Sequence, residues 1–226
     1  VTLGESLLPV LPQVLGRIKN MFDLYCDPEA ISKTLQSMNE LNNKVFVKGI
    51  RLPGCFDPFE MSVRAILGQQ ITVKAASTLA GRIVSTLGEK LETPVKELTH
   101  TFPRPERIVE LDGTIGEHLG PLGVIRSRAE AILSLAQAIM KNEICFDQCI
   151  DPAEEIRKLQ TIKGIGSRTA NYIAMRTMAW PDAFLETDIG IKHALPECSP
   201  KELRALSEQW RPWRSYATIS LWNSLE

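Results

Sequence analysis

Helix-start signals recur along this chain, whereas strand signals are nearly missing. An Asp or Ser that can cap a helix is followed by Pro and then Glu at Asp57, Asp151 and Ser199. Proline suits the first helical position, and a Glu side chain in the first turn can return a hydrogen bond to the capping residue. We interpret Ser127-Arg128-Ala129-Glu130 as a further start, of the capping-box type. These signals predict a chain of helices that short turns connect.

The apolar residues between these signals have the spacing of helices. Residues 11–22 and 76–87 carry apolar side chains at every third or fourth position, and the second run stops at Gly88, a common residue at a helix end. Only residues 44–52 alternate weakly, as a short strand would. We therefore predict an all-α protein.

Composition excludes several classes of protein. The chain has 226 residues, of which 44% are hydrophobic and 23% charged, and these values fit a globular protein and exclude wholesale disorder. We find no apolar run long enough to span a membrane and no visible secretory signal. The five cysteines are odd in number and scattered, which favours reduced thiols and a cytoplasmic location.

Side-chain metal sites are not expected, and charge gives little guidance. Cys145 and Cys149 are close in sequence, but no second pair follows, and the three histidines lie far apart. The net charge of −1 excludes a global positive field for nucleic acid, although residues 157–214 carry four more basic than acidic residues. By itself, that asymmetry is typical of a solvated surface. For any nucleic acid that the chain binds, the near-neutral charge predicts weak non-specific affinity that salt reduces.

The most informative segment is a glycine-rich turn between two expected helices. The helix that begins at Asp151 should end near Thr161, and another should begin near Ser167. Gly164 and Gly166 allow positive φ and a close approach to a ligand. The first N–H groups of the second helix form a potential phosphate site, beside Lys163 and Arg168, with Ile162 and Ile165 as anchors in the core. The alternative is an ordinary helical hairpin.

Several segments resemble a known family. Residues 159–171, Leu-Gln-Thr-Ile-Lys-Gly-Ile-Gly-Ser-Arg-Thr-Ala-Asn, resemble the helix–hairpin–helix of the DNA base-excision glycosylase superfamily, and Asp188 matches its catalytic aspartate. Residues 51–55, 59–73 and 210–217 resemble the bacterial 3-methyladenine DNA glycosylase II family of alkylation repair. The resemblance therefore covers nearly the whole chain.

The resemblance implies two helical lobes with the active cleft between them. One lobe would be residues 58–180, with the helix–hairpin–helix at about 151–180, and the other would combine 1–57 with 181–226. We expect the family's small N-terminal α/β domain to be absent, as in a truncated or naturally short member.

The chemistry of such enzymes requires a carboxylate near the sugar. Breaking the N-glycosidic bond places positive charge on the sugar, and a carboxylate stabilises that charge or helps water to attack. The resemblance assigns this role to Asp188. Asp188 is also a suitable N-cap for a helix at 189–194, as Thr187 is, and this alternative alone would explain an Asp there.

A base must leave the duplex before it can be cleaved, and the gap is then plugged. In the resembled family the plug comes from the loop that here holds Gln69 and Gln70, where its second position is usually Leu. Either glutamine can fill the gap and also hydrogen-bond the orphaned base. The alternative is a polar pair on a surface loop.

The base pocket implied by the resemblance includes Tyr172, Trp222 and Arg168, although both aromatic residues also fit core packing. Arg168 replaces a usual Trp, and Ile189 replaces a Tyr. This leaves the substrate open among 3-methyladenine, 7-methylguanine and a neutral damaged base. Bifunctional members have a Lys where Arg168 stands, and a guanidinium cannot act as that amine. We therefore predict a monofunctional enzyme without lyase activity.

Further contacts follow from the resemblance. DNA phosphates would meet Lys163, Gly164, Gly166, Ser167 and Thr169. The backbone carbonyls of Gln160, Ile162 and Ile165 would hold a structural monovalent cation, sodium or potassium, and we expect no other cofactor. The expected partner is double-stranded DNA with damaged bases, bound by a monomer at the bacterial nucleoid in the cytoplasm, with no membrane.

The leading hypothesis is a DNA glycosylase of base excision repair that hydrolyses the bond to alkylated purines. Two alternatives stay open. Helix–hairpin–helix elements also occur in proteins that only bind DNA, so the chain can be a non-catalytic DNA-binding module. It can also be a glycosylase for deaminated or mismatched bases, an alternative that Arg168 and Ile189 keep open.

Overall fold

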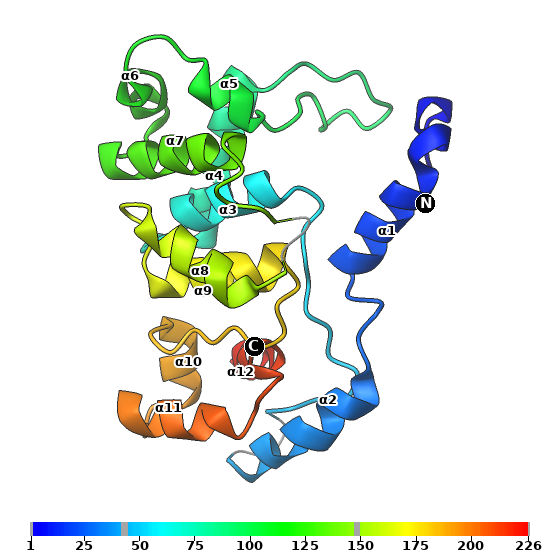
Figure 1. Cartoon of the computed structure of the whole chain (residues 1–226), viewed down its shortest axis with the longest axis vertical. Helices are drawn as coiled ribbons and strands as arrows, with labels where there is room; N and C mark the ends of the chain where they lie inside the picture. Colours follow the sequence, from blue (N-terminus) through cyan, green and yellow to red (C-terminus); the bar gives the residue numbers. More distant parts are fainter. Residues whose placement is uncertain (1, 42–44, 147–149, 226) are drawn as a thin grey trace. The chain divides into compact units, whose positions relative to one another are not determined.

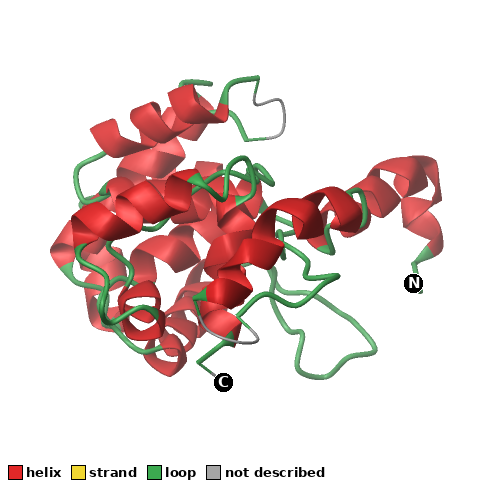
Figure 2. Cartoon of the chain, turned by 90° about the horizontal axis from the view of Figure 1, so that it is seen from below, coloured by secondary structure: helices red, strands yellow, loops and turns green. Residues whose placement is uncertain are grey.

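The computed structural model describes residues 2–41, 45–146 and 150–225, and these are almost entirely helices and connecting loops (Figure 2). The described residues form no strand, and their only isolated bridge is an antiparallel one between Lys90 and His100. The prediction of an all-α protein is confirmed. The strand considered at 44–52 is wrong for the described part, 45–52, and Lys44 lies outside it. None of the helices that the structure describes is long and apolar enough to cross a membrane.

The chain divides into two compact units, residues 57–173 and residues 1–56 with 174–226. The second boundary falls inside a helix, α9 (Ser167–Thr177), so residues 174–180 belong to the unit that contains the chain ends. The sequence-based division at residue 180 places these residues in the lobe of the hairpin instead.

The unit of residues 57–173 is organised around α7 (Arg126–Met140) (Figure 1). Helix α7 contacts α3 (Pro58–Leu67), α5 (Pro105–Val109) and α6 (Ile115–Leu119), and its buried face includes Ile132 and Leu135. The remaining elements are α4 (Val73–Leu87), the 3-10 turn η3 (Gly120–Leu122), α8 (Pro152–Thr161) and the first part of α9.

The other unit is organised around α12 (Arg214–Asn223), which is buried from Ser215 to Leu221 and contacts α10 (Ile189–Ala194). It also contains η1 (Glu5–Val10), α1 (Leu11–Met21), α2 (Pro28–Leu35), η2 (Gln36–Glu40) and α11 (Pro200–Glu208). Arg214, which is 15% exposed, donates from Nε and Nη2 to the buried carboxylate of Asp182 at 2.8 and 2.9 Å. This pair fixes the start of α12 on the loop that precedes α10.

Three of the four predicted helix starts are confirmed. The side chains of Asp57, Asp151 and Ser199 each accept from first-turn N–H groups, and Ser199 forms a full capping box with Glu202. At the fourth, the predicted helix is present but the predicted Ser127 cap is wrong. Helix α7 starts at Arg126 after the N-cap Ile125, whose backbone carbonyl accepts from the N–H groups of residues 128 and 129 without any side-chain cap.

The apolar stripe at 11–22 forms the predicted helix, α1, but does not enter the core. None of its helical residues is buried, and Phe22 after its end is 56% exposed. The stripe therefore correctly indicated the secondary structure of this segment but not its burial.

Candidate active site

The glycine-rich turn has the local geometry that its sequence predicts. Helix α8 ends at Thr161, the N–H of Ile165 donates to the Ile162 carbonyl at 3.0 Å, and α9 begins at Ser167. Ile162 and Ile165 are both buried, which confirms that they anchor the turn.

The two glycines of the turn meet different requirements. Gly164 has a φ of +97°, and a Cβ there would lie 3.3 Å from the Cβ of Ala131 on α7. Gly166 is not among the residues with positive φ, and a Cβ there would have no neighbour within 4 Å. The expectation of positive φ at Gly166 is therefore wrong. The fold itself therefore requires glycine at residue 164 but not at residue 166.

The turn has an exposed surface. Its exposed residues come from the turn itself and from the first turn of α9: Lys163, Gly164, Gly166, Ser167 and Arg168. Thr169 differs, because it is only 6% exposed and its hydroxyl accepts from Gln69 Nε2 at 3.0 Å. This burial argues against the expected contact between Thr169 and phosphate.

The glutamine pair between α3 and α4 is split between two roles. The Gln69 side chain turns inward and also donates to the Gly164 carbonyl at 2.8 Å, while the Gln69 carbonyl accepts from Nη2 of Arg128. Gln70 is exposed, with a φ of +56°. Of the two glutamines, the structure therefore leaves Gln70 free to reach a partner outside the protein.

Asp188 caps the N-terminus of α10, as its alternative interpretation predicted. The carboxylate is 3% exposed, and its Oδ1 accepts from the N–H groups of Gly190 and Ile191 at 2.9 and 3.2 Å. The same oxygen accepts from Trp222 Nε1 at 2.9 Å. Three N–H donors thus fix the orientation of this carboxylate.

The segment before Asp188 is held by an ion pair with α11. Arg204 donates from Nε and Nη2 to the two carboxylate oxygens of Glu186, both at 3.0 Å. Such a bidentate pair has a defined geometry. It therefore supports the backbone that carries Asp188.

Trp222 is half-buried on α12, so it is neither fully in the core nor fully exposed. Its indole approaches α10 over Gly190, where a Cβ would lie 2.8 Å from Trp222 Cδ1 and 3.0 Å from Asp188 Oδ1. A side chain at residue 190 would therefore collide with both groups. Ile189, between Asp188 and Gly190, is 67% exposed.

Tyr172, another residue of the expected base pocket, is half-buried on α9 in the unit of residues 57–173. Arg168 is exposed one turn earlier on the same helix. Asp188 and Trp222 both belong to the other unit, where the contact described above brings them together.

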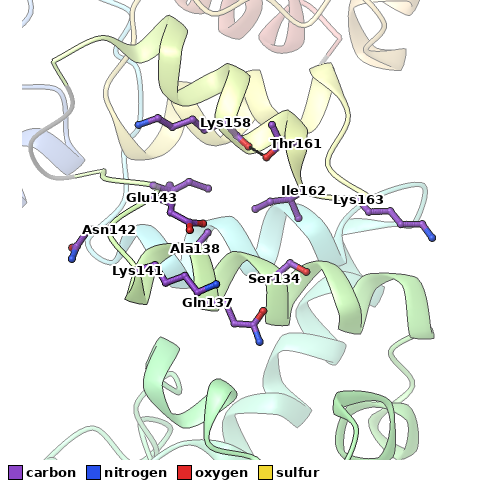
Figure 3. Close-up of a pocket in the computed structure, with 11 residues that line it drawn as sticks. Ser134, Gln137, Ala138, Lys141, Asn142, Glu143, Lys158, Thr161, Ile162 and Lys163 are labelled. Carbon is purple, nitrogen blue, oxygen red and sulfur yellow. Dashed lines mark hydrogen bonds between the residues drawn. The ribbon is translucent and has the colours of Figure 1, made fainter.

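A groove of about 500 Å³ lies between α7 and α8, next to the turn (Figure 3). Its lining has no aromatic residue to stack on a base. The Lys158 amine is paired with Glu155 at 2.7 Å, the Thr161 hydroxyl donates to the Lys158 carbonyl, and Lys163 points away from the centre of the groove. The groove does not have the chemistry of a base pocket.

The carbonyls expected to hold a cation lie at the same turn. The Ile162 carbonyl accepts one internal hydrogen bond, from Ile165, and a carbonyl oxygen has a second lone pair for a cation. Among the residues that the structure describes, no group of three His, Cys, Asp or Glu side chains is suited to a metal ion. Cys149, of the cysteine pair considered above, lies outside the described residues.

Residues 63–211 match the family model for the HhH-GPD superfamily of base excision DNA repair proteins. The chain belongs to this superfamily. The match includes the hairpin, Asp188 and the Gln69-Gln70 loop, so the recognition made from the sequence is confirmed.

This chain is similar to curated proteins over most of its length. It is 36% identical over 222 residues to DNA-3-methyladenine glycosylase 2 of Escherichia coli (strain K12), covering 98% of this chain and 75% of that protein. It is 39% identical over 216 residues to a probable bifunctional transcriptional activator/DNA repair enzyme AlkA of Mycobacterium tuberculosis, covering 93% of this chain and 42% of that protein. The chain therefore spans less than half the length of the mycobacterial relative.

Solved structures share the HhH-GPD fold. MBOgg1 in complex with a low affinity DNA ligand has a TM-score of 0.79 and 23% identity, with 94% of this chain and 74% of that chain covered. The 3-methyladenine DNA glycosylase from Archaeoglobus fulgidus has a TM-score of 0.73 and 20% identity, with 98% and 76% covered. At these identities the likeness shows the fold alone.

The N-terminal segment requires a correction. Residues 1–57 match the family model of the AlkA N-terminal domain, which we expected to be absent. The described residues of this segment form η1, α1, α2 and η2, without a strand. Residues 1–57 therefore correspond to that domain in sequence, and their described part is helical.

Sequence reasoning missed two residues of the site, Arg128 and Gly190. The sequence places Arg128 only in a predicted capping box, because helical spacing does not show that its guanidinium reaches a loop. A signal for Gly190 was available. Glycine is a poor residue in a helix and stands in the first turn after Asp188, so something other than helix formation had to require it.

Proposed function

We propose that this protein is a monofunctional DNA glycosylase, which removes alkylated purines from double-stranded DNA by hydrolysis of the N-glycosidic bond. The likeness to DNA-3-methyladenine glycosylase 2 of Escherichia coli supports the reaction and the substrate class. The carrying observation is the buried Asp188 carboxylate, whose Oδ1 three N–H donors hold in one orientation.

Asp188 acts on the positive charge that develops on the sugar. A carboxylate that is already oriented does not need to reorganise as the bond breaks, and the surrounding low dielectric strengthens its attraction for a cation. The same carboxylate is able to orient a water molecule for attack at the sugar carbon. Trp222 contributes by holding Oδ1 through its indole N–H.

The hairpin turn binds the DNA backbone. Exposed amides near Gly166 and Ser167, at the N-terminus of α9, suit phosphate oxygens, and Lys163 adds a positive charge beside them. Arg168 is exposed on the same helical turn, so we assign it to phosphate rather than to the base. This assignment removes the repulsion between a guanidinium and a cationic alkylated base.

Gln70 fills the space that the extruded nucleotide leaves. It is the exposed member of the glutamine pair, and Gln69 is bonded within the protein. A glutamine is able both to fill the gap and to hydrogen-bond the orphaned base. The aromatic faces of Tyr172 and Trp222 suit an electron-poor purine, for which stacking and cation–π attraction are favourable.

The absence of lyase activity follows from α9. A lyase of this superfamily needs an amine that forms an imine, and α9 has Arg168 and no lysine. Arginine stays protonated and cannot attack the sugar. The product is therefore an abasic site.

The turn suits a monovalent cation as a structural component. The carbonyls of Gln160, Ile162 and Ile165 are neutral oxygen donors, which favour a hard cation over a transition metal. A bound sodium or potassium ion supplies positive charge next to the phosphate site. No chemical step passes through it.

Base release from methylated duplex DNA tests the proposal, with Asp188→Asn beside the wild type. Asparagine is as good an N-cap as aspartate, so α10 keeps its cap while the charge is lost. We expect the wild type to release 3-methyladenine and 7-methylguanine, and the variant to bind the same duplex and release at least about a hundredfold less base. Undiminished release by the variant would contradict the role of Asp188.

Two other outcomes redirect the assignment. Release only from deaminated or mismatched duplexes would replace the substrate class and keep the reaction. Tight binding of damaged duplex without release of any base would support the non-catalytic DNA-binding module.

A further inference from the structure

Gln69 joins three parts of its unit that are distant in sequence. Its side-chain nitrogen donates to the Gly164 carbonyl of the hairpin turn at 2.8 Å and to Thr169 Oγ1 of α9 at 3.0 Å. Its own carbonyl accepts from Nη2 of Arg128 in the first turn of α7. The side chain and the main chain of one residue are thus both held by hydrogen bonds.

The chemistry of these contacts fixes the amide orientation. A backbone carbonyl only accepts hydrogen bonds, so the NH2 group of Gln69 must face Gly164, and its two hydrogens serve the two acceptors. Thr169 is 6% exposed, so its hydroxyl is largely shielded from water while Gln69 is in place. Loss of the NH2 group therefore removes the hydrogen bond to the Gly164 carbonyl and the part-buried one to Thr169.

The loop that Gln69 begins is short and fixed at its other end. Only residues 68–72 connect α3 to α4, and the Thr72 side chain caps α4 by accepting from the Ala75 N–H at 3.2 Å. Between these fixed points, Gln70 has a φ of +56°, a conformation that costs a non-glycine residue roughly 1 kcal/mol or more. Such a conformation persists where the neighbouring contacts determine it.

We propose that Gln69 and Arg128 are positioning residues, which hold Gln70 in its left-handed conformation and in register with the phosphate-binding turn. The inference rests on the proposed function, in which Gln70 enters the duplex. The turn that offers N–H groups to phosphate also offers the Gly164 carbonyl to Gln69. Binding of a phosphate at the turn therefore sets where Gln70 meets the duplex, before any base leaves the stack.

Substitutions at Gln69 and Arg128 test this role. Gln69→Glu keeps the shape of the side chain but replaces the donating NH2 group with an oxygen that repels the Gly164 carbonyl. Arg128→Met removes the contact to the Gln69 main chain and leaves the side chain of Gln69 intact. Gln137→Glu is the matched control, because Gln137 is exposed on α7 in the same unit and the change in charge is identical.

Base release is measured for a single 7-methylguanine in two settings, paired with cytosine and in a one-nucleotide bulge. Extrusion from the bulge breaks no base pair, so it depends less on the residue that enters the duplex. We expect Gln69→Glu and Arg128→Met to release the paired base at least about tenfold more slowly than wild type, and the bulged base within about threefold of it. The control variant should match the wild type on both.

Equal losses on both substrates would show a general structural role and overturn the proposal, as would rates like those of wild type. If the wild type releases no base from either substrate, the proposed function fails, and the positioning role is tested without cleavage. A 2-aminopurine next to the 7-methylguanine then reports unstacking by its fluorescence. A smaller increase with Gln69→Glu than with Gln137→Glu supports the proposal, and an equal increase overturns it.

Discussion

The indole N–H of Trp222 donates to Oδ1 of Asp188 at 2.9 Å, from a helix that starts well beyond the loop of the aspartate. This contact converts an ordinary helix cap into a carboxylate with three N–H donors on one oxygen. It depends on Gly190, because any side chain there would occupy the space of the indole edge. The cap and the catalytic interpretation of Asp188 are therefore compatible.

Gly190→Ala should slow base release by about tenfold or more, because its methyl group must displace the indole and disturb the orientation of the carboxylate. Alanine favours helix formation, so a loss cannot come from the helix propensity of α10. Single-turnover release from 7-methylguanine duplex measures the effect. Binding of an undamaged duplex should stay within about threefold of wild type, because the hairpin is unchanged.

Two variants control this experiment. Gly81→Ala lies in α4, where a Cβ meets nothing within 4 Å, so it should leave release unchanged and stabilise the protein by about 0.5–1 kcal/mol. Trp222→Phe removes the N–H donor and keeps an aromatic ring, so it should reproduce part of the loss. Release by Gly190→Ala at the wild-type rate would mean that Trp222 does not orient Asp188.

Alanine substitutions at Gly164 and Gly166 should have different consequences. Gly164 has a φ of +97° and a close neighbour, so Gly164→Ala should lower the free energy of unfolding by about 1–2 kcal/mol. Gly166 has neither feature, so Gly166→Ala should change the free energy of unfolding by less than about 0.5 kcal/mol. Its methyl group should nevertheless weaken duplex binding by about tenfold, because in the proposed function the backbone there approaches phosphate.

Urea unfolding and fluorescence anisotropy with a labelled duplex separate these effects. If Gly166→Ala binds DNA as tightly as the wild type does, no phosphate contacts this part of the turn. A Gly164→Ala variant of unchanged stability would mean that the turn relaxes without cost.

Local chemistry could be predicted from the sequence because its partners are close in the chain. The caps at Asp57, Asp151 and Ser199 each involve groups at most three residues apart, which a sequence pattern shows directly. The turn at residues 162–166 is equally local. The wrong helix start at Ser127 shows the limit, because the neighbouring Ile125 carbonyl satisfies the first N–H groups instead.

Tertiary contacts could not be predicted in the same way. Gln69 and Gln70 are identical neighbours, and what separates them is bonding to residues 95 and 100 positions further along the chain. The third donor to Asp188 lies 34 positions away. The resemblance to a family indicated which residues matter, but not which of their atoms meet.

Tyr216 and Asp23 provide a test in the unit of residues 1–56 and 174–226. The Tyr216 hydroxyl donates to Asp23 Oδ2 at 2.9 Å, and the Leu52 N–H donates to the same oxygen at 2.9 Å. Tyr216 is 3% exposed. Burial, followed by the hydrogen bond to Asp23, raises the pKa of the Tyr216 hydroxyl well above its ordinary value of 10.0.

The raised pKa makes stability fall at alkaline pH. Above about pH 10 the unfolded chain loses the Tyr216 proton while the folded chain keeps it, so the free energy of unfolding decreases by up to about 1.4 kcal/mol per pH unit. Burial and then Asp23 also raise the pKa of Cys26, so this thiol lowers the stability in the same way, beginning at a lower pH.

Tyr216→Phe should lower the free energy of unfolding by about 1 kcal/mol near neutral pH, because Asp23 loses a donor. Above about pH 10, however, the stability of this variant should fall less steeply than that of the wild type. Urea unfolding of both proteins between about pH 8 and about pH 11 measures the two curves. If the two curves of stability against pH stay parallel, folding does not raise the pKa of Tyr216.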